Sequence, residues 1–388
     1  MTQGHLVASL FAAYFFGFGL FLPFFPVVLR DSGLSPGEIG TLLSLPMLVR
    51  LAANPLVGAL ADRFATPRVA VSVLSALSAA LFLAFFLASA FWAYAVLLVA
   101  VALVWSPLIP IEDAVAARLD REGKGQYGRM RLWGSISFIA ANLVGGTAAA
   151  SAHAAPAVIG GIAAGLVVSA LVGLKLTVPS AREAERGPDD EQRVEGRAKS
   201  GMGFLLVVVG AGILQGSHGA YYGFSALFWE AEGFGGLAIG ILWGLGVTTE
   251  IVLFAFAGSV GARIGSLGIL GVGAGAAILR WVLFAQVSGP LATGSLQLLH
   301  GLSFGATHLG AVAYVAARAP RRWAGFSQGL LSMVFGFFTA LASALAGLLY
   351  QSGPSLAFQA MAAMAALGTL LLAAGALFPG ERRRAPAA

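Results

Sequence analysis

The chain has 388 residues, of which 58% are hydrophobic and only 10% are charged. A soluble domain carries roughly 25% charged residues, so this composition excludes an ordinary water-soluble protein and indicates that much of the surface faces lipid. The net charge of +6 does not indicate a nucleic-acid partner, because the basic residues stand in short stretches between long apolar runs. The absence of cysteine excludes disulfides, thiolate metal ligands and cysteine nucleophiles.

Apolar runs of membrane-spanning length recur along the whole chain. A spanning helix needs about 20 mostly apolar residues. The N-terminal MTQGH lacks the basic region of a signal peptide, so we expect the first run to be retained. The runs are 6–29, 38–60, 69–90, 92–116, 132–152, 155–178, 202–229, 237–259, 266–287, 290–317, 324–350 and 355–378. The sequence therefore predicts an all-α membrane protein with twelve transmembrane helices.

One long polar segment divides these runs into two groups of six. Its sequence, PSAREAERGPDDEQRVEGRAKSG, has the composition of a disordered linker. We expect an N-terminal six-helix bundle over 1–178, a cytoplasmic linker over 179–201 and a C-terminal six-helix bundle over 202–388. Transporters built from two repeated bundles bind substrate near the bilayer midplane between them, so this division favours a transporter.

The basic residues predict the orientation of the spans. If the N-terminus is cytoplasmic, every Lys and Arg except Arg30, Arg50 and Arg280 falls in or beside an inner loop or terminus. This is the distribution that the positive-inside rule requires. We therefore expect both termini to be cytoplasmic.

Ionisable side chains inside the predicted spans are the candidate functional residues, because each costs about 2.5–3.5 kcal/mol at mid-membrane on insertion scales. No phosphate-binding loop or His-Glu-x-x-His motif is present. We therefore expect neither ATP-driven transport, nor an enzyme, nor a metal site. The candidates are Arg50, Glu112, Asp113, Arg131, His218, Glu250, Arg280, His300 and His308.

In the first half, Asp113 and Arg131 flank a short inner loop, and antiparallel neighbouring helices could bring them together. The pair is either a salt bridge that closes the hairpin or a substrate-binding pair. Phe138 lies two turns beyond Arg131 on the same helical face, where it could form an apolar wall or simply pack. Arg50 could equally contact an anionic substrate or pair with Glu112.

In the second half, Glu250, Arg280 and His300 lie on three successive predicted spans. A buried carboxylate near an arginine can load and release a proton when the arginine moves, which is what proton coupling requires. The alternative is a neutralised structural cluster. His308 lies eight residues beyond His300, about 80° around a helix, which excludes a metal-binding pair and leaves an assisting role.

His218, in the segment GSHGAYYGF, could line the cavity with Tyr221 or could be a hydrogen-bonded packing group. Both alternatives remain open at the level of the sequence.

Five segments together resemble the phenylpropionic-acid transporter-like branch of the major facilitator superfamily. They are FLPFFPVVLRDSGLSPGEIG, WSPLIPIEDA, YGRMRLWGSISF, LQGSHGAYYGFSALFWEAEG and LLHGLSFGATHLG. The chain is more distantly similar to the lactose permease type of sugar–proton symporter. In that permease, an acidic residue on the fourth span and a Gly-Arg-x-Arg segment at the start of the fifth span bind the substrate. Asp113 matches the acidic residue and Arg131 matches the second arginine of the segment, so the resemblance implies that both bind substrate. Arg280 and His300 match that permease's coupling arginine and histidine in position.

Two departures from the permease pattern change the expectation. Ser303 stands where the permease carries its proton-bearing glutamate, so we expect the proton carrier to be Glu250, assisted by His300 or His308. Phe138 stands where the permease has a sugar-stacking tryptophan, which weakens sugar as the substrate.

These features predict a proton-driven symporter of the prokaryotic inner membrane that imports a small organic solute, most simply an aromatic carboxylate. The resemblance implies a monomer surrounded by lipid, with protons as the coupling ion and no other cofactor. A sugar or nucleoside symporter and a proton-coupled exporter of amphipathic compounds remain open. A non-transporting receptor is disfavoured, because a sensor needs no buried proton relay.

Overall fold

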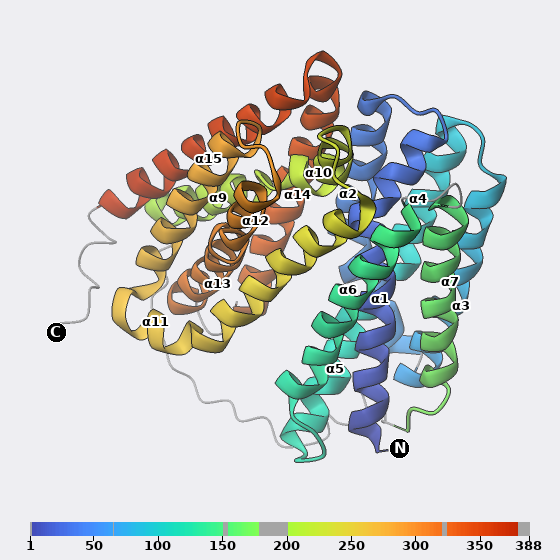
Figure 1. Ribbon diagram of the computed structural model, residues 1–388. Coiled ribbons are helices and arrows are strands. Elements are labelled where there is room, and N and C mark those ends of the chain that lie inside the picture. The colour runs from blue at the N-terminus through green and yellow to red at the C-terminus, as the bar shows by residue number, and fades with distance from the viewer. Residues whose placement is uncertain (1, 65, 150–153, 178–200, 320–323, 379–388) are drawn as a thin grey trace. The chain divides into compact units, whose positions relative to one another are not determined.

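The computed structural model describes residues 2–64, 66–149, 154–177, 201–319 and 324–378. Every regular element in those ranges is helical (Figure 1). Nine helices in the described ranges are long and apolar enough to cross a membrane, so the chain is an all-α, multi-pass membrane protein. The predicted linker over 179–201 lies, except for its last residue, outside the described ranges.

The first half of the chain folds into seven α-helices and one turn of 3₁₀-helix within the described residues. Their bounds are α1 Gln3–Asp31, α2 Pro36–Phe64, α3 Pro67–Ala84, η1 Phe85–Leu87, α4 Phe91–Trp105, α5 Leu108–Arg121, α6 Tyr127–Ala149 and α7 Ala154–Gly173.

The second half contains longer helices and one π-helical segment. Their bounds are α9 Met202–Gly216, α10 Gly219–Ala231, α11 Gly236–Phe284, α12 Pro290–Leu298, η2 Gly301–Ala306, α13 Thr307–Arg318, α14 Ala324–Ser352 and α15 Pro354–Leu377.

Each predicted apolar run coincides with helix in the described residues, but three runs are broken helices. The run 92–116 covers α4 and α5, 202–229 covers α9 and α10, and 290–317 covers α12, η2 and α13. Such interruptions free backbone groups at membrane depth, where protein rather than lipid must surround them. The exact number of twelve spans stays a prediction.

The predicted eighth and ninth spans meet at Gly265. Both runs fall within α11, whose only non-helical residue is Gly265, with φ 66° and ψ 173°. A positive φ of this kind is strained for residues with a Cβ atom but open to glycine. Gly265 therefore separates the two spans without a long loop.

The chain divides into two compact units. Unit 1 contains α1–α7 together with Ser225–Gly244, and unit 2 contains α9, α10 up to Phe224, and the chain from Leu245 through α15. The six-plus-six division of the sequence stays a prediction.

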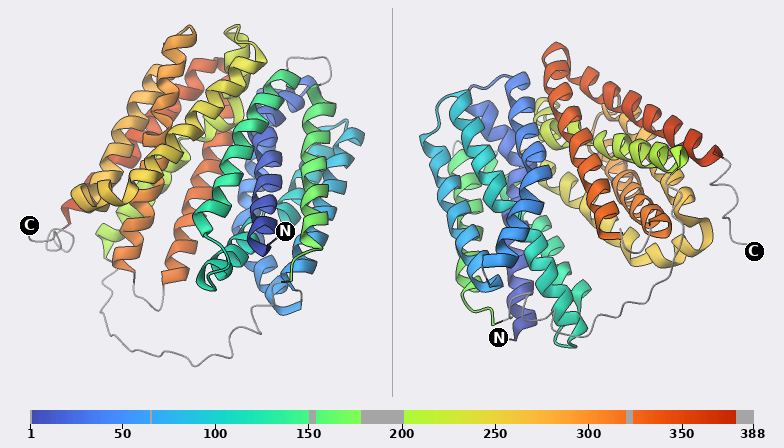
Figure 2. Two further views of the ribbon diagram at one scale, coloured as in Figure 1. Left: turned by 60° about the horizontal axis from the view of Figure 1, so that its bottom comes forward. Right: turned by 180° about the vertical axis from the view of Figure 1, so that it is seen from behind.

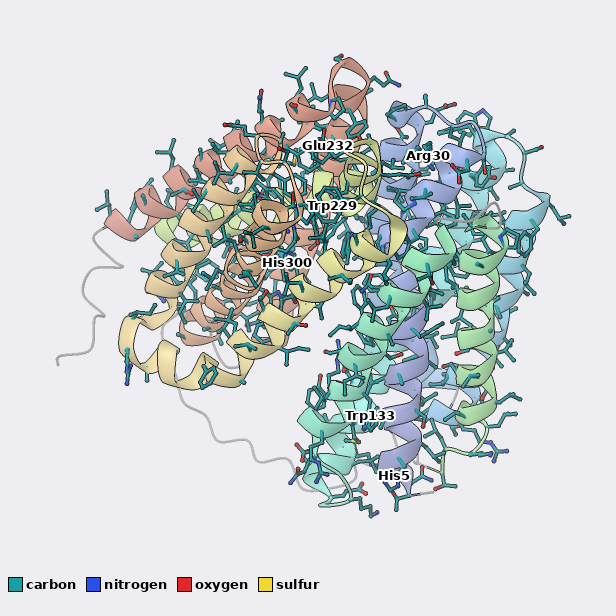
Figure 3. All side chains as sticks on the ribbon, viewed as in Figure 1. His5, Arg30, Trp133, Trp229, Glu232 and His300 are labelled. Atoms are coloured by element: carbon teal, nitrogen blue, oxygen red, sulfur yellow. The ribbon has the colours of Figure 1, made fainter. Side chains whose placement is uncertain are left out.

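In unit 1, α1 packs against α6 and α7, and α3 packs against α7 and α4 (Figures 1 and 2). A salt bridge attaches Ser225–Gly244 to this unit: Arg30 NH1 at the end of α1 lies 2.6 Å from Glu230 Oε2. Arg30 is labelled in Figure 3. In unit 2, α9 packs against α15 and α14, and α13 packs against α14.

Candidate functional site

Unit 1 holds four ionisable side chains that we call the first charge cluster: Arg50, Glu112, Asp113 and Arg131. Arg50 lies on α2, both acids lie on α5, and Arg131 lies on α6. All four charges act electrostatically on the Tyr14 hydroxyl of α1. The short connection between α5 and α6 brings Asp113 to Arg131.

Asp113 and Arg131 form a loose pair. Arg131 Nε lies 3.7 Å from Asp113 Oδ1, and Tyr127 donates a hydrogen bond of 2.9 Å to the same carboxylate oxygen. About a third of each charged side chain is exposed, 33% for Arg131 and 36% for Asp113. This separation is longer than a charge-assisted hydrogen bond of about 2.7–2.9 Å, so the guanidinium is not committed to Asp113.

Aromatic rings of α1 lie against both arginines of the first charge cluster. Arg131 Cζ is 4.1 Å from the centroid of Phe15 and 5.2 Å from that of Phe11. Arg50 Cζ is 5.9 Å from the centroid of Phe18. Within about 6 Å an aromatic face attracts a cation, so the rings hold both guanidinium groups in place.

Arg50 and Glu112 do not pair. Neither carboxylate oxygen of Glu112 has a hydrogen-bond partner, and Arg50 Nε also lacks one. Of the two sequence alternatives for Arg50, the pair with Glu112 is therefore wrong. Contact with an anionic substrate stays a prediction.

Phe138 is buried, and the Phe18 ring connects it to the first charge cluster. Its centroid is 6.2 Å from that of Phe18, the ring that faces Arg50. The rings closest to Arg131 are Phe11 and Phe15 instead.

Unit 2 contains the second charge cluster, which consists of Glu250, Arg280 and His300. His300, labelled in Figure 3, connects the other two: its Nε2 lies 2.8 Å from Glu250 Oε1 and its Nδ1 lies 2.8 Å from Arg280 NH1. Arg280 also donates to Gln297 Oε1 at 2.9 Å. The structure therefore brings together the three residues that the sequence places on separate spans.

The hydrogen bonds fix the histidine tautomer in this arrangement. Arg280 can only donate, so His300 Nδ1 accepts and His300 Nε2 carries the hydrogen that it donates to Glu250. Arg280 and His300 are 0% and 3% exposed, whereas the Glu250 side chain is 16% exposed. Glu250 is therefore the most exposed member of the second charge cluster.

Ser303 extends the second charge cluster to His218. Arg280 NH1 donates to Ser303 Oγ at 3.4 Å, and Ser303 Oγ lies 3.3 Å from His218 Nε2. His218 Nδ1 lies 3.0 Å from the carbonyl oxygen of Gln215, so it donates there and Nε2 accepts. Ser303 therefore links Arg280 to His218 through hydrogen bonds.

Aromatic side chains enclose Arg280. Its Cζ lies 4.5 Å from the Tyr221 ring centroid and 4.6 Å from that of Trp281. Trp281 in turn donates a 2.9 Å hydrogen bond to Ser217 Oγ. Tyr221 is fully buried against Arg280, so it belongs to the second charge cluster's surroundings.

His308 stands apart from the charged groups. The Phe304 ring lies between the two histidines, stacked 5.5 Å from His300 and 6.2 Å from His308. An assisting role for His308 in proton transfer stays a prediction.

A π-helical segment begins directly after His300. Gly301 donates its backbone N–H to Thr249 Oγ1 at 2.9 Å, and a Cβ atom at Gly301 would lie 2.6 Å from the Thr249 carbonyl oxygen. Two adjacent pairs therefore join α11 to this segment, Thr249 with Gly301 and Glu250 with His300. π-Helical insertions are frequent at functional sites.

Sequence reasoning did not select Thr249, Gln297 or the α1 rings. Thr249 and Gln297 are uncharged, and their roles depend on contacts between helices. The α1 rings carry a readable signal: Phe11, Phe15 and Phe18 follow the i, i+4, i+7 spacing of one helical face.

The sequence matches the model of the MFS_1 like family over residues 7–360. It is 31% identical over 350 residues to a probable 3-phenylpropionic acid transporter of Escherichia coli (strain K12), covering 87% of this chain and 89% of that protein. It is 30% identical over 326 residues to a maltose permease of Geobacillus stearothermophilus, covering 82% and 80%.

Solved structures show the same fold. The nucleoside transporter NupG aligns with a TM-score of 0.80 at 16% identity, over 97% of this chain and 98% of that one. A bacterial homologue of the lysosomal transporter Spinster, in an inward-facing conformation, aligns with a TM-score of 0.72 at 14% identity, over 99% and 98%. The chain is a transporter rather than an enzyme, and it belongs to the MFS_1 like family of the major facilitator superfamily.

Proposed function

We propose that the protein is a proton-coupled symporter that imports a small aromatic carboxylate by alternating access between its two halves. The observation that carries the proton-coupling proposal is the hydrogen-bonded chain from Glu250 through His300 to Arg280. The substrate proposal is supported by the relative described as a probable 3-phenylpropionic acid transporter.

The first charge cluster suits an aromatic anion. Arg131 Nε is 3.7 Å from Asp113 Oδ1, and the Arg131 side chain is partly exposed. The Arg131 guanidinium can therefore donate two hydrogen bonds to a substrate carboxylate. Phe15 and Phe18 are half-buried beside the two arginines and offer aromatic surface for the ring. These contacts give one site for the charge and one for the apolar part of the substrate.

The second charge cluster suits a proton. When Glu250 is ionised, its charge is balanced by Arg280 through the neutral ring of His300. A proton on Glu250 removes one of these two charges and leaves the buried arginine alone. Loss of that balance favours a different arrangement of the helices, which is how protonation can bias a conformational equilibrium.

A sugar symporter is the second candidate, because the chain is 30% identical to a maltose permease. Asp113 would then accept hydrogen bonds from sugar hydroxyl groups, and Tyr127 would hold it in place. An exporter of amphipathic compounds would share the fold and differ in the direction of flux.

Orientation and location follow the sequence. We place the protein in the prokaryotic inner membrane as a monomer with both termini in the cytoplasm, supported by the distribution of Lys and Arg residues.

The test uses the full chain reconstituted in lipid vesicles whose exterior is more acidic than their interior, so that protons are driven inward. Wild type should accumulate radiolabelled 3-phenylpropionate against its concentration gradient, and Glu250→Gln should equilibrate it without accumulation. Glu232→Gln, which changes an exposed glutamate outside the cluster, is the matched control and should behave as wild type. Normal accumulation by Glu250→Gln would overturn the proton-coupling proposal.

A further inference from the structure

Glu112 is a buried carboxyl group that the proposed cycle does not use. Its side chain lies on α5, the residue is 1% exposed, and neither carboxylate oxygen has a hydrogen-bond partner. An ionised carboxylate in such a position is strongly disfavoured, because neither water nor a donor stabilises its charge. A proton on Glu112 would remove this cost.

Among the described residues, the charged groups that act electrostatically on Glu112 belong to the first charge cluster. Asp113 on the same helix and Arg131 on α6 act on it electrostatically. Glu112 and Arg50, which lies on α2, both act electrostatically on the Tyr14 hydroxyl of α1.

The proton on Glu112 decides the net charge of the first charge cluster. With Glu112 neutral, two arginines and Asp113 leave one net positive charge, which attracts a monoanion. With Glu112 ionised, two arginines and two carboxylates cancel, and the attraction is lost. Protonation and anion binding therefore favour each other, and this coupling is reciprocal.

We propose that Glu112 is a second proton-binding site, separate from Glu250, whose proton binds together with the anionic substrate at the first charge cluster. The proposal rests on the proposed function, because it requires that the substrate be an anion.

A second proton changes what drives transport. One proton moved with a monoanion carries no net charge, so only the pH gradient contributes. Two protons moved with a monoanion carry one net positive charge, and each 100 mV then supports about fiftyfold accumulation. The second site thus gives an anion importer access to the membrane potential.

The first arm of the test measures binding of 3-phenylpropionate to the purified full chain between about pH 6 and 9, where the ligand stays ionised. The affinity of wild type for 3-phenylpropionate should fall as the pH rises, by up to about tenfold per pH unit for one linked proton. Glu112→Gln and Glu112→Leu both keep the position neutral, so the part of the pH dependence that comes from Glu112 should be lost and their profiles should be flatter than that of wild type. The leucine variant covers the case in which the glutamine amide disturbs folding.

The control is Glu232→Gln, which changes an exposed glutamate outside both charge clusters and should retain the wild-type pH dependence of binding. Wild-type and Glu112→Gln profiles that coincide would overturn the proposal, as would a pH dependence that Glu250→Gln removes entirely.

The second arm is independent of any substrate. The infrared spectrum of wild type should contain the carbonyl stretch of a protonated carboxyl group that Glu112→Gln removes and Asp113→Asn retains. Absence of that difference band overturns the proposal. If wild type and variants bind no carboxylate at any pH while the band is present, the proposed substrate class fails, and Glu112 stands as a proton site for another ligand.

Discussion

His300 Nε2 lies 2.8 Å from Glu250 Oε1, and the residues directly beside them, Gly301 and Thr249, share a backbone-to-side-chain hydrogen bond of 2.9 Å. The π-helical segment is therefore held to α11 at two consecutive positions. The Glu250–His300 contact contains the ionisable carboxylate, and the Thr249–Gly301 hydrogen bond aligns the π-helical segment with α11.

Thr249→Val should weaken proton coupling while the protein still folds. Valine keeps the shape of threonine but leaves the Gly301 N–H without its acceptor, a loss of about 1–3 kcal/mol for a buried donor. We expect accumulation of substrate to fall several-fold, with the pH profile of uptake displaced and counterflow retained. Thr147→Val is the matched control, because the Thr147 hydroxyl bonds only to its own helix. An unchanged pH profile would assign Thr249 a purely structural role.

Asp113→Asn distinguishes the two candidate substrates. Asp113 repels a carboxylate bound at Arg131, so its neutralisation should tighten binding of an aromatic anion by about tenfold, or ~1.4 kcal/mol. Phe11 and Phe15 continue to hold Arg131 in the variant. A sugar, by contrast, would lose a charged acceptor and bind much more weakly.

The measurement is equilibrium binding of 3-phenylpropionate and of maltose to both proteins. Asp120→Asn, an exposed change on the same helix, serves as the control. Weaker binding of the anion by Asp113→Asn would contradict the account.

Glu122 should not contribute to the pH dependence of uptake. Hydrogen bonds from Arg118 and Lys124 lower the pKa of this loop carboxyl from its ordinary value near 4.5 to about 2. Because the folded-state pKa is depressed, its stabilising effect is complete above the unfolded value and is lost only as pH falls toward 2. Glu122→Gln should therefore leave the uptake profile between about pH 5 and 8 unchanged. A displaced profile would place a titrating group in this loop.

The helices could be predicted from the sequence because membrane burial makes hydropathy a direct signal. Each apolar run coincides with helix in the described residues, and three of the ionisable residues that stand out in those runs meet in the second charge cluster. Asp113 and Arg131 could be paired because a short turn constrains their helices to be neighbours.

Other features depend on packing, which one sequence does not reveal. A proline, Pro107, stands at the break between α4 and α5, but the other two breaks and the π-helical segment after His300 have no hydropathy signal. In the sequence, Ser303 marks a position without an ionisable side chain. In the structure, its hydroxyl forms hydrogen bonds with both Arg280 and His218. The lack of an Arg50–Glu112 pair likewise depends on side-chain geometry rather than on the spacing of the residues.

The most direct measurement of proton coupling through Glu250 is the external pH of lightly buffered vesicles when 3-phenylpropionate is added. Wild-type vesicles should alkalinise the medium as protons enter with the substrate, and Glu250→Gln vesicles should give no alkalinisation although they still exchange substrate. Equal alkalinisation by both proteins, or accumulation by wild type without any alkalinisation, would contradict the account.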